Sequence, residues 1–419
     1  MEWEDMSHME HARAVNTLLQ SLQDSHAAVS AWDWIWAVEK RHGSVPIRWA
    51  LEGDGLWVAS SAVDGLAAGV RVLALNGIAA SDCVSIARDL GNVEGRSPVG
   101  QDRTGVHNLT AWIMGQTASD TLHVLWLDRE SGTTKNLAIP GVRLLKAARA
   151  WKPISQKGQT VQWAFPDEGN SLGLERASVL AVSSFSQGRF GKYQRRLWKG
   201  FRRAKEIGLP LVIDLRGNAG GQSARMEMLW RHVANARRQL PFGLVAKQSL
   251  ETHREIHKHY KRLRKRWVDK HKETSLEARY IYDMAHLPVG GRDTLEFPMQ
   301  PLVDWRFKGP VCVLMDGESA SATVSFAGAF QQDGRGPIFG EPCLGAQQGT
   351  MGNPMFKVLP VSRIVVSMST AVYMAQANGD WTNPSSPVRP DVFIPQMWRN
   401  EDTLRANLQT WIDSHNPAE

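Results

Sequence analysis

The segment from Gly309 to Thr350 constrains the fold more than any other part of the chain. An apolar run, Val311 to Leu314, ends at the turn Asp316-Gly317, and a Ser-Ala-Ser-Ala block of small residues follows. We predict that the run is a buried strand and that a helix spans Thr323–Gln331, directly after the block. A serine at such a corner is either an ordinary N-cap or a nucleophile. At a helix N-terminus, free backbone N–H groups and the positive end of the dipole can stabilise an oxyanion.

A second stretch, residues 209–221, reads LPLVIDLRGNAGG. Its apolar run predicts a buried strand that ends in Asp214 and Arg216. The glycine-rich turn that follows can present backbone amides to a ligand, or it can be an ordinary connection between two elements.

A third stretch places Ser25 and His26 just after a helix expected near residues 8–23. The histidine is either a structural residue or a general base. The apolar face of that helix is expected to comprise Val15, Leu18, Leu19 and Leu22. The aromatic segment that follows, Trp32 to Trp36, is expected to be a short strand or groove wall, or to pack in the core.

Taken together and in this order, the motifs resemble the S41 peptidase family, which includes C-terminal processing proteases, tricorn protease and the interphotoreceptor retinoid-binding repeats. The matching segments are D-S-H, I-D-L-R-x-N-x-G-G, S-A-S-A, G-E-P-x-x-G and P-D-V, and the resemblance covers about residues 15–395. It implies a mixed α/β fold with a crotonase-like ββα-spiral core, a PDZ-like β-rich domain and an N-terminal helical segment. The domains are expected at residues 1–45 (helical, carrying the base), 46–145 (PDZ-like) and 146–419 (catalytic core, with a basic insert over about 235–300).

Within this resemblance, the second serine of the small-residue block, Ser321, is the expected nucleophile, and Ser319 is the competitor. The processing-protease branch supplies the base from a lysine, but Ala346 stands in that position here. The tricorn-like branch uses a histidine after a serine, which matches Ser25 and His26. His26 is therefore the expected general base, with Ser25 helping to orient the relay.

The third position of the triad departs from the family, because Pro384 stands where the tricorn-like branch has a glutamate. Asp380, Asn383 or Asp391 orients the imidazole instead, or the site works as a dyad. The expected oxyanion hole comprises the backbone N–H of Gly220 or Gly221 together with that of Ala322. Asp214 and Arg216 are expected to form a structural ion pair.

The implied function is that of a serine endopeptidase that hydrolyses polypeptides through an acyl-enzyme. The alternative is a catalytically weak or inactive protein of the same fold that binds a peptide or an apolar ligand. No cofactor or metal is expected: the three cysteines are scattered, and His253 and His257 lack a third ligand. The family is mostly exported, although no secretion signal is visible at the acidic start of the chain.

The composition bounds the partners. The net charge is +7, but much of the excess lies in the insert, where nine Lys or Arg and four His face three acids between Glu251 and Lys272. A solvated helix is expected there, and no specific nucleic acid is expected as a partner. No apolar run is long enough to span a bilayer. The oligomeric state is not predicted.

Overall fold

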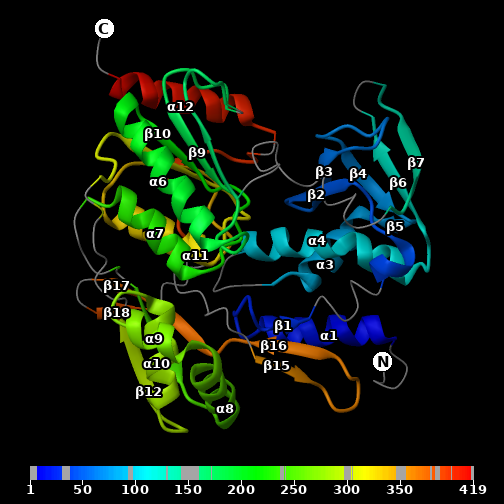
Figure 1. The fold of residues 1–419 in the computed structure, drawn as a ribbon. Coiled ribbons are helices and arrows are strands. Elements are labelled where there is room, and N and C mark those ends of the chain that lie inside the picture. The colour runs from blue at the N-terminus through cyan, green and yellow to red at the C-terminus, as the bar shows by residue number, and fades with distance from the viewer. Residues whose placement is uncertain are drawn as a thin grey trace. The chain divides into compact units, whose positions relative to one another are not determined.

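The computed structural model describes residues 7–30, 38–92, 98–128, 131–142, 160–170, 172–235, 240, 242–296, 303, 305–345, 355–377, 380–382, 387–397 and 399–416. The chain divides into two compact units. Unit 1 comprises Met1–Pro153 and Phe356–Met368, and unit 2 comprises Ile154–Met355 and Ser369–Glu419. Both units combine helices with sheets (Figure 1), so the predicted mixed α/β class is confirmed.

Unit 1 contains an antiparallel sheet in the order β2-β3-β4-β6-β7, with β5 paired to β4. Its strands are β2 (Ile47–Glu52), β3 (Gly55–Ser61), β4 (Arg71–Leu75), β5 (Ile78–Ala79), β6 (Thr121–Leu127) and β7 (Thr134–Pro140). Helices α3 (Ala80–Leu90) and α4 (Pro98–Gln116) share one apolar core with this sheet. The PDZ-like character of this region stays a prediction.

The N-terminal helix of unit 1, α1 (His8–Gln20), begins at a capping box in which Ser7 and Glu10 satisfy each other's backbone N–H groups. Its buried positions are Ala12 and Asn16. The expected apolar face was therefore partly wrong: Leu18 and Leu22 are 71% and 58% exposed. The polar Asn16 takes the inner face because its side chain bonds the carbonyls of Asp89 and Gly91 and accepts the Val29 N–H.

Asn16 thereby ties α1 to strand β1 (Ala28–Val29), which begins two residues after His26. β1 pairs antiparallel with β16 (Val365–Met368), and β15 (Met355–Val358) completes this small sheet. Residues 21–27 therefore connect two fixed segments, α1, which Asn16 anchors, and β1, which pairs with β16. The aromatic segment 32–36 lies outside the described residues.

The main sheet of unit 2 has the order β19-β14-β13-β10-β9-β8. It is parallel except for the β8–β9 pair. Its strands are β8 (Val161–Ala164), β9 (Ser178–Val182), β10 (Leu211–Asp214), β13 (Val311–Met315), β14 (Ile338–Gly340) and β19 (Val392–Phe393).

Helices cover both faces of this sheet, which explains its continuous apolar strands. Alternate residues of β10 belong to different cores: Leu211 and Ile213 pack with helices α6 (Phe190–Ile207), α7 (Ser223–Val233) and α11 (Ala322–Gln332). Val212 packs with α12 (Glu401–His415) on the other face (Figure 1).

The rest of unit 2 includes an antiparallel sheet in the order β12-β11-β17-β18 and a helical segment. The strands are β11 (Phe242–Lys247), β12 (Arg292–Glu296), β17 (Ala371–Ala377) and β18 (Asp380–Thr382). The basic insert is helical, as expected, but it is divided into α8 (Leu250–His259), the π-helical η3 (Tyr260–Arg264), α9 (Lys265–His271) and α10 (Leu276–His286). Among the described residues, no helix has the length and apolarity that crossing a bilayer requires.

Helix α6 packs so closely on β8 that Gly200 is needed there. A Cβ at this position would lie 1.9 Å from Cε2 of Trp163. That indole ring is stacked on Phe165 and contacts the edge of Phe201, so it cannot move freely.

We expect Gly200→Ala to lower the free energy of unfolding by about 1–3 kcal/mol, because overpacking outweighs the roughly 1 kcal/mol that alanine gains in a helix. Gly191→Ala is the matched control, since an added Cβ there meets nothing within 4 Å. Urea denaturation of both variants is the measurement. Equal stability of the two variants would contradict the packing argument.

Candidate active site

The serine corner and the glycine turn follow adjacent strands of the unit 2 sheet. β10 and β13 pair in parallel, with Leu211 opposite Val311 and Asp214 opposite Leu314. The carboxyl ends of parallel strands meet at one edge of a sheet, which is where open α/β sheets bind ligands. Two motifs that are about a hundred residues apart in the sequence therefore lie together.

Ser321 holds a strained backbone conformation at the start of α11. Its φ is 54° and its ψ is −120°, and its side chain makes no cap hydrogen bond. A non-glycine residue in this region costs of order 1–3 kcal/mol and is typical of functional sites. The sharp strand-to-helix turn of nucleophile elbows presents a serine hydroxyl in the same manner. The alternative interpretation, an ordinary N-cap serine, does not fit this geometry.

The competing serine, Ser319, is fully buried at 0% exposure. Its hydroxyl donates to the carbonyl of Leu215 at 3.0 Å and accepts the Asp316 N–H at 3.0 Å. Its carbonyl accepts the N–H of Leu344, from the G-E-P loop, at 2.9 Å. Ser319 thus fastens the corner to its neighbours, whereas Ser321 is half-buried and accessible.

Asn218, which the sequence analysis quoted in a motif but gave no role, fastens the corner to the glycine turn. Its carbonyl accepts the Ala320 N–H at 3.0 Å and the Thr323 hydroxyl at 2.9 Å. Its side-chain amide donates to the Val182 carbonyl and accepts the Gly220 N–H, both at 2.9 Å. The sequence carried no signal for this role, because the burial of Asn218 and the pairing of both ends of its amide are visible only in the fold.

The two candidate glycines of the oxyanion hole have different roles. Gly220 (φ 87°) lies against the corner, where an added Cβ would come within 2.6 Å of both the Ala320 carbonyl oxygen and the Ser321 Cβ. Its N–H is occupied by Asn218. In the described part of the chain, neither the Gly221 N–H nor the Ala322 N–H has an acceptor. Of the three candidate N–H groups, only that of Gly220 is therefore occupied by a described residue.

Asp214 and Arg216 form the bidentate pair that the sequence suggested, with N–O distances of 2.9 and 2.7 Å. Asp214 also accepts the backbone N–H of Arg216. Asp316 accepts the Gly217 N–H at 2.9 Å and so joins the glycine turn to the β13 end. The carboxylates near the corner therefore shape the turn.

His26 lies in unit 1, in the turn between α1 and β1. The hydroxyl of Ser367 donates to its carbonyl at 2.6 Å, and its own N–H donates to Asp24. Its ring Nδ1 is 3.8 Å from Oδ1 of Asp24. Burial lowers the pKa of His26 from its usual value, and the Asp24 carboxylate acts against that effect. Burial thus favours the neutral imidazole, which is the form that a general base needs.

Ser25 and His26 belong to unit 1, whereas Ser321 belongs to unit 2. The surroundings of these residues are therefore described within each unit separately. Ala346, Asn383 and Pro384 lie outside the described residues, and nothing is described of the Asp380 side chain.

Asp391, a candidate for the third position, is bound elsewhere. Its carboxylate accepts the Ile338 N–H at 2.8 Å and the Gln331 amide at 3.3 Å. Gln331 lies near the end of α11, about 15 Å along the helix axis from Ser321 at 1.5 Å per residue. Asp391 therefore joins the far end of α11 to the sheet. The carboxylate that the structure places beside His26 is Asp24.

Comparisons with known proteins identify the fold and the family. Mature CPAF, solved in complex with lactacystin, matches with a TM-score of 0.61 at 12% identity, covering 98% of this chain and 90% of that chain. A second structure of mature CPAF gives 0.60 at 12% identity over 99% and 90%. The photosystem II D1 C-terminal processing protease gives 0.43 at 16% identity over 93% and 83%.

No curated protein matches the chain. The sequence profile of peptidase family S41 matches residues 176–394, which is more than half of the chain and includes both the glycine turn and the serine corner. The chain belongs to peptidase family S41.

Proposed function

We propose that this chain is a serine endopeptidase that cleaves polypeptides through an acyl-enzyme, with Ser321 as nucleophile and His26 as general base. A peptidase activity follows from the family. The observation that carries the finer proposal is the strained corner, φ 54° and ψ −120°, which turns the Ser321 side chain away from the capping position.

In the first step, the Ser321 oxygen attacks the carbonyl carbon of the scissile bond while His26 removes the hydroxyl proton. The carbonyl oxygen becomes an oxyanion, which the N–H groups of Gly221 and Ala322 stabilise. Donors of this kind contribute roughly 3–4 kcal/mol each to catalysis. The tetrahedral intermediate then expels the amine, which takes its proton from the His26 imidazolium. A water molecule, deprotonated by His26, then attacks the acyl-enzyme ester. Ser321 regains its proton from the imidazolium, and the carboxylic acid product is released.

Asp24 takes the third position in this proposal, because it is the carboxylate beside the His26 ring. Its negative charge favours the imidazolium that forms during the attack. The 3.8 Å separation is long for a hydrogen bond, and catalytic contacts of this kind tighten when substrate binds. Ser25, the neighbour of His26 in the chain, helps to orient this relay. In this proposal Asp24 replaces the glutamate that the tricorn-like branch has at the position of Pro384.

A fluorophosphonate probe tests the nucleophile and the base. We expect the wild type to be labelled at Ser321, Ser321→Ala to lose labelling, and His26→Ala to label at least about 10²-fold more slowly, because the hydroxyl loses its base. Peptide mapping by mass spectrometry identifies the labelled residue, and hydrolysis of unfolded casein is measured in parallel.

His123→Ala is the matched control for the base, because it removes an exposed histidine from the same unit. Labelling that does not depend on His26 would disprove the Ser/His pair. If the wild type neither labels nor cleaves casein but retains unfolded polypeptide on a column, the protein is the non-catalytic binding member of the family.

The pH profile tests Asp24. Because catalysis needs neutral His26, kcat/KM falls as the pH drops through the pKa of His26, which lies below 6.5. Asp24 raises that pKa, so Asp24→Asn should move this acid limb to a lower pH and reduce kcat by about 10²-fold. Asp64→Asn, which removes an exposed acid from the same unit, should leave the profile in place. An acid limb that stays or moves upward in Asp24→Asn would exclude the assigned role.

The strain at Ser321 predicts an unusual stability difference between two inactive variants. Glycine adopts positive φ without strain, whereas alanine does not. We expect the free energy of unfolding of Ser321→Gly to be about 1–2 kcal/mol higher than that of Ser321→Ala. Chemical denaturation of the two variants provides the comparison, and a more stable alanine variant would show that the corner is relaxed.

A further inference from the structure

Helix α6 of unit 2 carries more positive charge than its neighbours neutralise. Seven of its 18 residues are Lys or Arg, and its one acid is Glu206. In its C-terminal half, Arg202 pairs with Glu206, and Arg203 pairs with Asp167 and Glu168. Four cations of its N-terminal half have no acidic partner among the residues that the structure describes. We call them the cationic stripe: Lys192, Arg195, Arg196 and Lys199.

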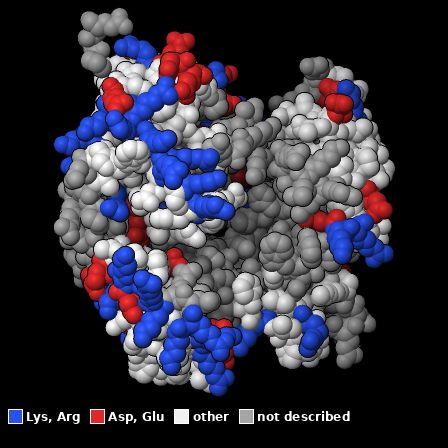
Figure 2. Space-filling view, viewed as in Figure 1, with Lys and Arg blue, Asp and Glu red and all other residues white. Residues whose placement is uncertain are grey.

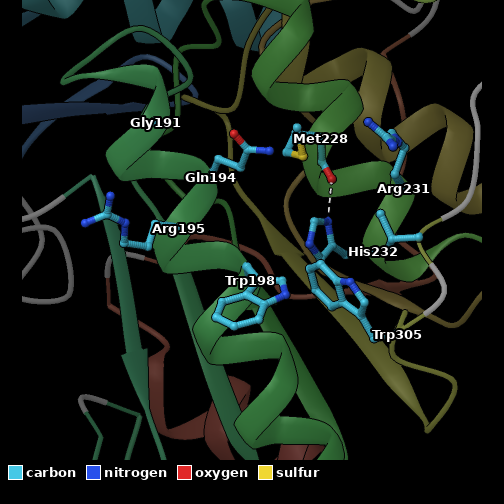
Figure 3. A pocket seen from close by; sticks show the side chains of 9 residues that line it. Gly191, Gln194, Arg195, Trp198, Met228, Arg231, His232 and Trp305 are labelled. Atoms are coloured by element: carbon cyan, nitrogen blue, oxygen red, sulfur yellow. Dashed lines mark hydrogen bonds between the residues drawn. The ribbon is translucent and has the colours of Figure 1, made fainter.

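The cationic stripe lies on one face of α6. Its members occupy positions i, i+3, i+4 and i+7, which are neighbours on a helix surface. Lys192, Arg195 and Lys199 are exposed, and Arg196 is half-buried. Figure 2 shows Lys and Arg side chains gathered over α6. In Figure 3 the guanidinium of Arg195 points away from the pocket that α6 and α7 line, so its charge is directed outward.

This arrangement of charge opposes the stability of the helix. Like charges four positions apart destabilise a helix, as in the pairs Lys192 with Arg196 and Arg195 with Lys199. The first turn of α6 has no acid, and Arg189 at its N-cap makes no side-chain cap hydrogen bond. The positive end of the helix dipole therefore adds to the field of the stripe. Such a surface attracts an anionic partner.

The N-terminal end of α6 is attached to the glycine turn of the candidate active site. The N–H of Phe185 donates to the Gly220 carbonyl at 2.9 Å, and the Phe185 carbonyl accepts the Gln222 N–H at 3.1 Å. Phe190, the first residue of α6, is five residues after Phe185. Five residues span at most about 18 Å. The stripe therefore begins close to the turn that carries two of the candidate oxyanion glycines.

A buried arginine holds the segment between the turn and the helix. Arg225 of α7 is 2% exposed, and its guanidinium donates to the carbonyls of Gln187 and Gly188, both at 2.5 Å. These bonds fix the start of α6 against α7. The position of the stripe relative to the glycine turn is thus set by hydrogen bonds within unit 2.

We propose that the cationic stripe binds acidic segments of the polypeptide substrate at a distance from the scissile bond. The inference rests on the proposed function, because that function places a substrate at the glycine turn. From Lys192 to Lys199 the stripe is about 10 Å long, which matches about three residues of an extended peptide. Lys and Arg donate charge-assisted hydrogen bonds to carboxylates. The enzyme therefore prefers substrates with Asp and Glu clustered within about ten residues of the cleaved bond.

Binding is tested first, in the full chain with Ser321→Ala, so that no cleavage is needed. The probes are two fluorescent, unstructured peptides of equal length. One is rich in Gly, Ser and Glu, and the other has Gln at every Glu position. Fluorescence anisotropy at low salt should show the Glu peptide binding at least about tenfold more tightly than the Gln peptide. Equal binding of the two peptides, or binding of neither, overturns the proposal.

Two variants with the same net charge locate the surface. Each replaces two Lys and two Arg by Gln in the Ser321→Ala background. The stripe variant is Lys192→Gln/Arg195→Gln/Arg196→Gln/Lys199→Gln. The control changes four exposed cations of the basic insert and is Lys261→Gln/Arg262→Gln/Lys265→Gln/Arg266→Gln. The stripe variant should bind the Glu peptide about tenfold more weakly and the control less than about twofold more weakly. Equal losses would show that net charge alone attracts the peptide, and the assignment fails.

Cleavage is tested with a peptide library in which mass spectrometry maps the bonds that are cut, with Ser321 intact. We expect Asp and Glu to be enriched near the bonds that the wild type cuts, and the stripe variant alone to lose this enrichment. Cleavage without acidic enrichment contradicts the proposal. If the wild type cuts no peptide, the proposed function fails, and the binding comparison still decides whether the stripe recognises acidic polypeptide. Stripe-dependent binding to phosphatidylserine vesicles, with no preference for the Glu peptide, assigns the stripe to a membrane surface instead.

Discussion

The candidate site depends on the parallel pairing of β10 with β13. This pairing brings the ends of the two strands to one edge of the sheet. Asn218 then joins the glycine turn to the serine corner through two hydrogen bonds of its carbonyl, and two bonds of its side chain hold it to β9 and to Gly220. Because each bond is buried, loss of one partner leaves a polar group unsatisfied, at a cost of about 1–3 kcal/mol. The position of Ser321 is thus determined by backbone contacts, and little of it depends on the hydroxyl itself.

Much of the fold could be predicted from local patterns. The apolar runs of β10 and β13 and the helix after the small residues could be predicted, since each is an apolar segment next to a turn or a cap. The face of α1 was predicted in part, because Leu18 and Leu22 match the helical spacing yet are exposed, whereas Asn16 is buried. A polar residue is buried when distant carbonyls pair with it, and its own sequence neighbourhood does not show this.

The site residues named from the sequence stay predictions, and the geometry that surrounds them could not be predicted. Ser321 has a positive φ, and the residues that contact its corner, Gly220 and Asn218, are about a hundred positions away in the sequence. The occupation of the Gly220 N–H follows from a side-chain rotamer. Asp24 was quoted beside His26 but was not assigned, because the resemblance directs attention to the C-terminal region. In the structure, burial and the Asp24 charge act on His26 in opposite directions, and burial prevails.

The long separation between β10 and β13 has a consequence for biosynthesis. Leu211 pairs with Val311 across a hundred residues, and contacts this distant form late because loop closure must precede them. A chain that has emerged only as far as the insert holds a glycine turn with no serine opposite it. Under the proposed mechanism, in which Ser321 is the nucleophile, the nascent polypeptide cannot hydrolyse peptides until β13 and the serine corner have been synthesised and have paired with β10.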